Sequence, residues 1–145
     1  MLRTQNQQTL PVTLDNLSQE HLCASMNWFA GMSVREKWNL SVNESADLLG
    51  GIPIRTYHDI KRKASKGLPV NINRDMAERL SLFLGIWKTL QIIVPCNRKD
   101  LAYAWFNQAN KSHVLLGKSI KEYLLERKSI EALYVVRRYL DSIER

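Results

Sequence analysis

The stretch from Ser41 to Ala64 reads SVNESADLLGGIPIRTYHDIKRKA, and it decides the fold prediction. Ser41 and Glu44 have the spacing of a capping box, in which each side chain accepts a hydrogen bond from the other residue's backbone amide. Gly50-Gly51 ends the first helix, because glycine adopts left-handed backbone angles without steric cost. Pro53 suits the first turn of a second helix. The stretch therefore predicts a helix, a tight turn and another helix.

The second predicted helix is amphipathic and basic. Tyr57, Ile60 and Ala64 recur at helical spacing, and basic residues occupy many of the other positions. This is the order of parts in a DNA-binding helix-turn-helix, whose second helix enters the major groove. An ordinary helical hairpin with a solvated basic face is the alternative interpretation.

The candidate DNA-binding residues fall into three groups. Arg55 and Thr56 lie near the start of the second helix, where side chains best reach base edges. Ser41 and Asn43 lie at the start of the first helix, which favours phosphate contact. The later basic residues predict phosphate contacts that position a protein without reading sequence. The full set is Ser41, Asn43, Arg55, Thr56, His58, Lys61, Arg62, Lys63 and Lys66.

Charge is distributed unevenly along the 145 residues, whose formal net charge is +7. Residues 51–75 hold six basic and two acidic side chains, which fits a polyanionic partner. Residues 96–145 hold ten basic and six acidic side chains, a second basic region that needs its own explanation. Cys23 and Cys96 have no companion at metal-ligand spacing, so we expect reduced thiols and no metal site. With no apolar leader and no membrane-spanning run, we expect a cytoplasmic protein.

Helical periodicity continues outside the opening stretch, and no pair of strands is convincing, so the expected fold class is all-α. Gly31 is expected to end the first helix, and Pro95 the longest one. Gly85 inside the longest helix predicts the close approach of another helix. The predicted helices are 16–30, a short one capped by Ser33 with Glu36, 74–94 capped by Asn73, one capped by Asn97, 119–126 capped by Ser119 with Glu122, and a last one capped by Ser129.

A series of short motifs begins inside the opening stretch and continues toward the C-terminus. They are Leu48-Leu49-Gly50, Arg79-Leu80, Leu84-Gly85-Ile86, Ala104-Trp105-Phe106 with Asn107 and Asn110, Leu116-Gly117, Ser119-Ile120, and Val136-Arg137-Arg138-Tyr139-Leu140. In these motifs the chain, from about Lys37 to Ser142, resembles bacterial antitoxins that carry the Xre/MbcA/ParS toxin-binding domain. It departs from the family pattern at Ala109 and Ile120, where proline is common, and at 126–128, where a glycine is common.

The resemblance implies an all-α protein in two parts, an Xre-like helix-turn-helix over 13–72 and a toxin-binding domain over 73–145. Residues 1–12 are polar and include Pro11, so we expect a disordered tail there. Such antitoxins bind a RES-domain toxin that consumes NAD, cover its active site with their last helices and repress their own operon. The implied partners are a cognate toxin and operator DNA, with no cofactor. A homodimer is also expected, since repressors usually bind paired half-sites. The toxin-facing candidates are Asn110, Gly117, Lys118, Ser119, Arg137, Arg138 and Arg145.

The arginines at the end of the chain have a physical rationale in that role. A pocket that binds NAD attracts cations, and a guanidinium pairs bidentately with carboxylates or occupies a phosphate position. The alternative is that Arg137 and Arg138 are solvated charges that stabilise a helix C-terminus.

No phosphate-cradling glycine loop, HExxH or GxSxG motif occurs, so we expect no enzymatic activity. Three rival functions stay open: a helix-turn-helix transcriptional regulator without a toxin partner, a toxin-binding protein that does not bind DNA, and a small enzyme.

Overall fold

The computed structural model describes residues 18–144 of the chain. Within that range the chain forms seven helices and no strand, which confirms the all-α prediction. The predicted tail over 1–12 and the candidate Arg145 lie outside the described residues. The helices are α2 (Gln19–Met32), α3 (Val42–Leu48), α4 (Ile54–Ser65), α5 (Arg74–Ile93), α6 (Lys99–Asn107), α7 (Ile120–Arg127) and α8 (Ile130–Glu144).

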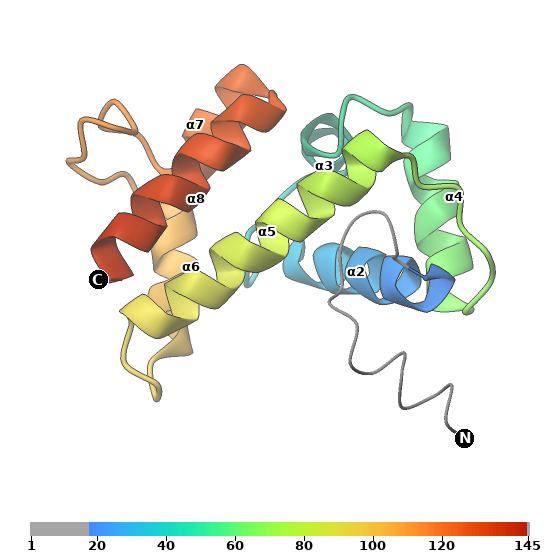
Figure 1. The fold of residues 1–145 in the computed structure, drawn as a ribbon, viewed down its shortest axis with the longest axis horizontal. Coiled ribbons are helices and arrows are strands. Elements are labelled where there is room, and N and C mark those ends of the chain that lie inside the picture. Colours follow the sequence, from blue (N-terminus) through green and yellow to red (C-terminus); the bar gives the residue numbers. More distant parts are fainter. Residues whose placement is uncertain (1–17, 145) are drawn as a thin grey trace, which may run out of the picture.

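The long helix α5 crosses the molecule and joins two groups of helices (Figure 1). The helices α2, α3 and α4 lie around its beginning, and α6 lies at its end. The helix α8 runs parallel to α5, since Tyr134 donates a hydrogen bond to Glu78 and Thr89 donates one to Asp141. The predicted boundary at residue 72 falls in the loop before α5, and one hydrophobic core continues across it.

Trp38 is the centre of an aromatic cluster that connects the two groups of helices. Its side chain is 0% exposed, and its ring stacks on Phe106 of α6 with centroids 4.2 Å apart. Phe83 and Trp87 of α5 lie 5.8 Å and 6.2 Å from the same ring. The segment between α2 and α3 is therefore packed against both α5 and α6.

Four of the predicted helix caps are confirmed. Ser41 with Glu44 and Ser119 with Glu122 form complete capping boxes. Asn73 accepts from the Met76 amide at 2.8 Å, and Ser129 accepts from the amide of Ala132 at 3.2 Å. In each of these caps, the donor and the acceptor belong to residues that are three positions apart in the sequence.

The predicted helix after Ser33 is wrong. Residues 33–38 form turns, and Ser33 instead ends α2, where its hydroxyl donates to the carbonyl of Phe29 at 2.9 Å. The chain turns here because Trp38 must enter the core, and Asn39 takes a left-handed φ of 53° immediately afterwards. Gly31 does not end α2 either, since the helix continues to the buried Met32.

Two further helix boundaries differ from prediction. Asn97 does not cap α6, whose N-cap is Arg98 without a side-chain cap. Arg98 pairs with Asp100 at 2.8 Å, so the helix start is organised by an ion pair. Pro53 precedes α4 as its N-cap, one position before the first turn in which it was expected.

Arg79 of α5 ties the two groups of helices together through their backbones. Its side chain is nearly buried, and its Nη1 donates to the carbonyls of Leu48 at 3.3 Å and Lys128 at 3.0 Å. Its Nε donates to Asp75 at 3.0 Å. Both carbonyls lie at helix C-termini, where the last carbonyls lack intrahelical partners. One guanidinium thus donates hydrogen bonds to carbonyls at the C-terminal ends of both α3 and α7.

Lys128 marks the turn between α7 and α8, within the segment where the resembled family commonly has glycine. Its backbone is left-handed, with φ 56° and ψ 13°. A residue with a side chain costs roughly 1–2 kcal/mol in this conformation. The departure from the family pattern therefore leaves the turn intact and adds local strain.

Candidate functional site

The inner side of α4 holds the helix against the rest of the fold. Tyr57, Ile60 and Ala64 are buried there, mainly against α2. The Tyr57 hydroxyl forms hydrogen bonds with Ser45 of α3 and Ser33 at the end of α2, and burial raises the pKa of this phenol. These contacts fix the orientation of α4, so its opposite side faces solvent.

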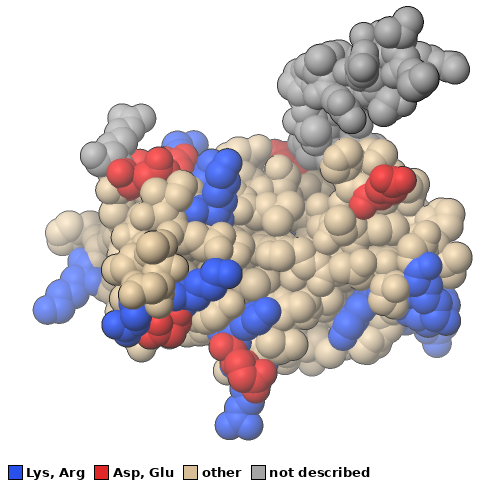
Figure 2. Space-filling view, turned by 90° about the horizontal axis from the view of Figure 1, so that it is seen from below, with Lys and Arg blue, Asp and Glu red and all other residues tan. Residues whose placement is uncertain are grey.

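The outward side of α4 carries a stripe of charged residues. Arg55, Asp59, Arg62 and Lys66 follow one another at spacings of four, three and four, which places them on one face of a helix. We call these four residues the outer stripe. The three basic residues are exposed, and His58 and Lys61 flank them in exposed positions. Figure 2 shows one face of the molecule, on which basic side chains gather at both ends around a broad uncharged area.

Asp59 is ion-paired with two cations of its own helix. Its Oδ1 lies 2.8 Å from Arg62 Nη2, and its Oδ2 lies 3.1 Å from Lys63 Nζ. Hydrogen bonds from Lys63 and then Arg62 hold the pKa of the Asp59 carboxyl below its ordinary value. Asp59, Thr56 and Lys63 also line a hollow of about 370 Å³ between α4 and the loop that carries Asn71.

The structure separates the nucleic-acid candidates into available and engaged groups. Arg55, Thr56 and Lys61 are exposed on α4, and Asn43 is exposed at the start of α3. The Ser41 hydroxyl is engaged, because it accepts from the Glu44 amide at 3.1 Å. The sequence reasoning did not select Asp59, although its place four residues after Arg55 and three before Arg62 signals the same face.

The two arginines of the last helix face different surroundings. Arg137 lies across α5, where it donates to the Gly85 carbonyl at 2.8 Å and to Thr89, and pairs with Asp141 at 3.1 Å. A Cβ on Gly85 would lie 2.9 Å from Arg137 Nε, which confirms the predicted close approach of another helix. Arg138 is exposed and forms no hydrogen bond or ion pair with the residues that the structure describes. Of the pair, Arg138 is the one presented to solvent.

The loop between α6 and α7 carries the other toxin-facing candidates. Gly117 is exposed with φ 77°, and Lys118 pairs with Glu126. Ser119 is buried and caps α7. Leu116 combines a left-handed φ of 57° with 59% exposure, so the turn presents an apolar side chain outward.

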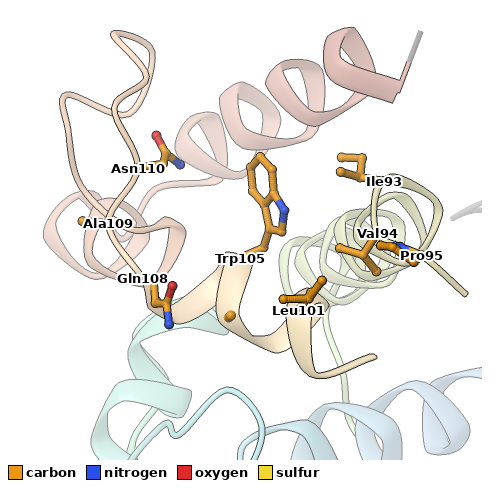
Figure 3. A pocket seen from close by; sticks show the side chains of 9 residues that line it. Ile93, Val94, Pro95, Leu101, Trp105, Gln108, Ala109 and Asn110 are labelled. Atoms are coloured by element: carbon orange, nitrogen blue, oxygen red, sulfur yellow. The ribbon is translucent and has the colours of Figure 1, made fainter. Parts of the chain in front are cut away.

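A pocket of about 350 Å³ opens beside this loop. Figure 3 shows the Trp105 indole with the end of α5 on one side and the segment from Gln108 to Asn110 on the other. Asn110 Oδ1 accepts from the Ser112 amide at 2.8 Å, while its Nδ2 is buried without a hydrogen-bond partner among residues 18–144. The pocket is lined by Ile93, Val94, Pro95, Leu101, Ala104, Trp105, Gln108, Ala109 and Asn110.

Within the described range, the helices are too short or too polar to cross a membrane.

Comparisons with known proteins give one relative of note. The chain is 32% identical over 109 residues to an uncharacterized protein, y4oB, of Sinorhizobium fredii, and the alignment covers 75% of this chain and 77% of the relative. No family model matches the chain. No solved structure matches it either.

Proposed function

The chain belongs to the family of the Sinorhizobium fredii protein y4oB, and we propose that it is an antitoxin that also represses its own operon. In this proposal the protein neutralises a cognate RES-domain toxin, which consumes NAD, by covering the toxin's active site. It binds operator DNA through α3 and α4, which form the helix-turn-helix of an Xre-like module. It acts in the cytoplasm as a homodimer and carries out no catalysis.

The observation that carries the DNA-binding part is the outward face of α4. The helix is anchored by Tyr57, Ile60 and Ala64, while Arg55, Arg62 and Lys66 project into solvent. A helix held by one side with cations on the other satisfies both requirements of a recognition helix, which are rigid placement and attraction to phosphate.

The toxin-binding part rests on the resemblance of the C-terminal motifs, and two surface features support it. Arg138 is an exposed cation on the last helix, suited to a pocket that binds phosphates. Leu116 offers an exposed apolar contact on the loop between α6 and α7. Arg137 contributes indirectly, since its bonds to Gly85 and Thr89 hold α8 on α5.

Arg55→Ala tests the DNA-binding part. We expect it to weaken binding to a duplex from the protein's own promoter by about 1–3 kcal/mol, the cost of losing one good contact to a base edge. Fluorescence anisotropy over a range of salt concentrations measures this loss. Lys88→Ala removes an equal charge from an exposed site on α5 and is expected to leave the affinity unchanged. Equal losses in the two variants would contradict a role for α4 in recognition.

Co-expression with the product of the neighbouring gene tests the toxin-binding part. We expect a complex that co-purifies and prevents NAD loss, and we expect Arg138→Glu to weaken this protection while the melting temperature stays the same. The reason is that Arg138 has no internal partner among the described residues, so its reversal affects only a bound protein. Lys88→Glu is the matched control. Absence of both complex and protection, together with salt-sensitive promoter binding, favours the alternative of a transcriptional regulator without a toxin.

A further inference from the structure

Asp59 is the one acidic residue in the sequence of α4, and it lies in the middle of the outer stripe. Arg55 precedes it by one turn and Arg62 follows it by one turn, so the three side chains share one face. If α4 enters a groove of DNA, a negative charge therefore lies between two cations of the side that faces the groove. Every phosphate near the groove is repelled by it.

The ion pairs of Asp59 explain little of the stability of α4. The Asp59 side chain is 44% exposed, and Arg62 is 52% exposed. Exposed pairs at these spacings stabilise a helix only slightly. Their larger effect is on charge, because Asp59 cancels one of the two positive charges that Arg62 and Lys63 would otherwise present to phosphates.

The carboxylate also retains capacity to recognise a base. Each oxygen of Asp59 accepts one hydrogen bond, from Arg62 or from Lys63, and a carboxylate provides about four acceptor sites in total. In the major groove, an aspartate of this kind accepts from the N4 amino group of cytosine. Arg62 and Lys63 hold the carboxylate in place while leaving acceptor sites free.

We propose that Asp59 sets the sequence selectivity of α4, by weakening its binding to every duplex and restoring affinity only where a cytosine amino group donates to the carboxylate. This inference rests on the proposed DNA binding by α4. It assigns to Asp59 the discrimination between operator and bulk DNA, whereas the basic residues supply affinity.

The test compares the full-length protein with its Asp59→Asn variant on two duplexes, one from its own promoter and one of random sequence. We expect the variant to bind the random duplex about tenfold more tightly near 0.1 M salt, with a salt dependence steeper by about 0.9 in the log–log slope, since one more phosphate charge is neutralised. Affinity for the promoter duplex rises less, so the ratio between the two affinities falls. The asparagine of Asp59→Asn could itself contact adenine through its amide, whereas alanine could not. Asp59→Ala is therefore expected to lower the ratio of promoter affinity to random-duplex affinity as well.

Asp100→Asn is the matched control. Asp100 is an exposed carboxylate paired with Arg98 at 2.8 Å, at the start of α6, so its substitution also raises the net charge by one and also frees a cation. We expect it to leave both affinities nearly unchanged. If Asp100→Asn equals Asp59→Asn, the effect is one of global charge and the inference is overturned.

The two levels of the proposal fail in different ways. If neither the wild-type protein nor Asp59→Asn binds either duplex at low salt, DNA binding by α4 is itself wrong. If both bind and their affinity ratio and salt slope agree, DNA binding stands and the role assigned to Asp59 is wrong.

Discussion

Trp38→Ala is expected to lower the free energy of unfolding by about 3–5 kcal/mol, the usual cost of truncating a fully buried aromatic side chain. Trp38 is 0% exposed, and its ring contacts Phe106 and Phe83 from two different helices. Its removal leaves a cavity where the segment before α3 meets α5 and α6. Urea denaturation followed by circular dichroism measures the change.

Trp105→Ala is the matched control for that prediction, because it deletes the same side chain from a half-buried position beside the pocket. We expect a distinctly smaller loss of stability. Trp38→Phe is expected to cost less than Trp38→Ala, since it keeps an aromatic ring and removes an indole N–H that is buried without a partner in the described part of the chain. Similar losses for Trp38→Ala and Trp105→Ala would show that the aromatic cluster is not central to the core.

Arg79→Met is the second large effect, with an expected loss of about 2–4 kcal/mol in the free energy of unfolding. Methionine keeps much of the apolar volume but leaves the carbonyls of Leu48 and Lys128 without their donor, and a buried acceptor left unsatisfied costs about 1–3 kcal/mol. The same denaturation experiment reports it. Because one hydrophobic core still runs through both groups of helices, the transition is expected to stay a single step.

Arg137→Met provides the comparison for Arg79. Arg137 also donates to a backbone carbonyl, that of Gly85, but its side chain is one-third exposed, so water can replace the lost bond. We expect a loss of about 1 kcal/mol, typical of one hydrogen bond. A neutral Arg79→Met would mean that the desolvation cost of its guanidinium cancels the carbonyl contacts, as occurs for some buried charges.

The structural features that could be predicted from the sequence are those whose partners lie within one turn of chain. The Ser41 and Glu44 box closes over three residues, and so does the box of Ser119 and Glu122. The same pattern at Ser33 and Glu36 failed because a distant requirement, the burial of Trp38, determines the backbone there. A local capping pattern therefore predicts a helix reliably only where the burial of nearby side chains does not require a different backbone conformation.

The roles of the buried and half-buried arginines could not be predicted, because their partners are far away in the sequence. Arg79 bonds to carbonyls 31 and 49 residues away. The sequence predicted a close helix approach at Gly85 and a functional cation at Arg137. Nothing in the local sequence of either residue shows that the two contact each other. The toxin-facing role of Arg137 stays a prediction.

Asp59 was missed for a different reason. A count of charges along residues 51–75 gives six basic and two acidic side chains, and it does not show where Asp59 lies on α4. Its proposed role depends on where it lies on the helix surface, and that place is known only once Tyr57 and Ile60 are known to be buried. Once that inner side is known, helical spacing alone places Asp59 opposite it.

The shared helix α5 limits how proteins built like this one can diversify. In multidomain proteins, domain boundaries usually fall in linkers where few contacts cross. A chimera joined at residue 72 would place an unrelated helix face against α2 and would remove the donor that Arg79 provides to Leu48. Under the proposed function, new binding specificities are therefore expected to arise by point substitution on the outer stripe and on the loop after α6, and not by exchange of the part that contains α5.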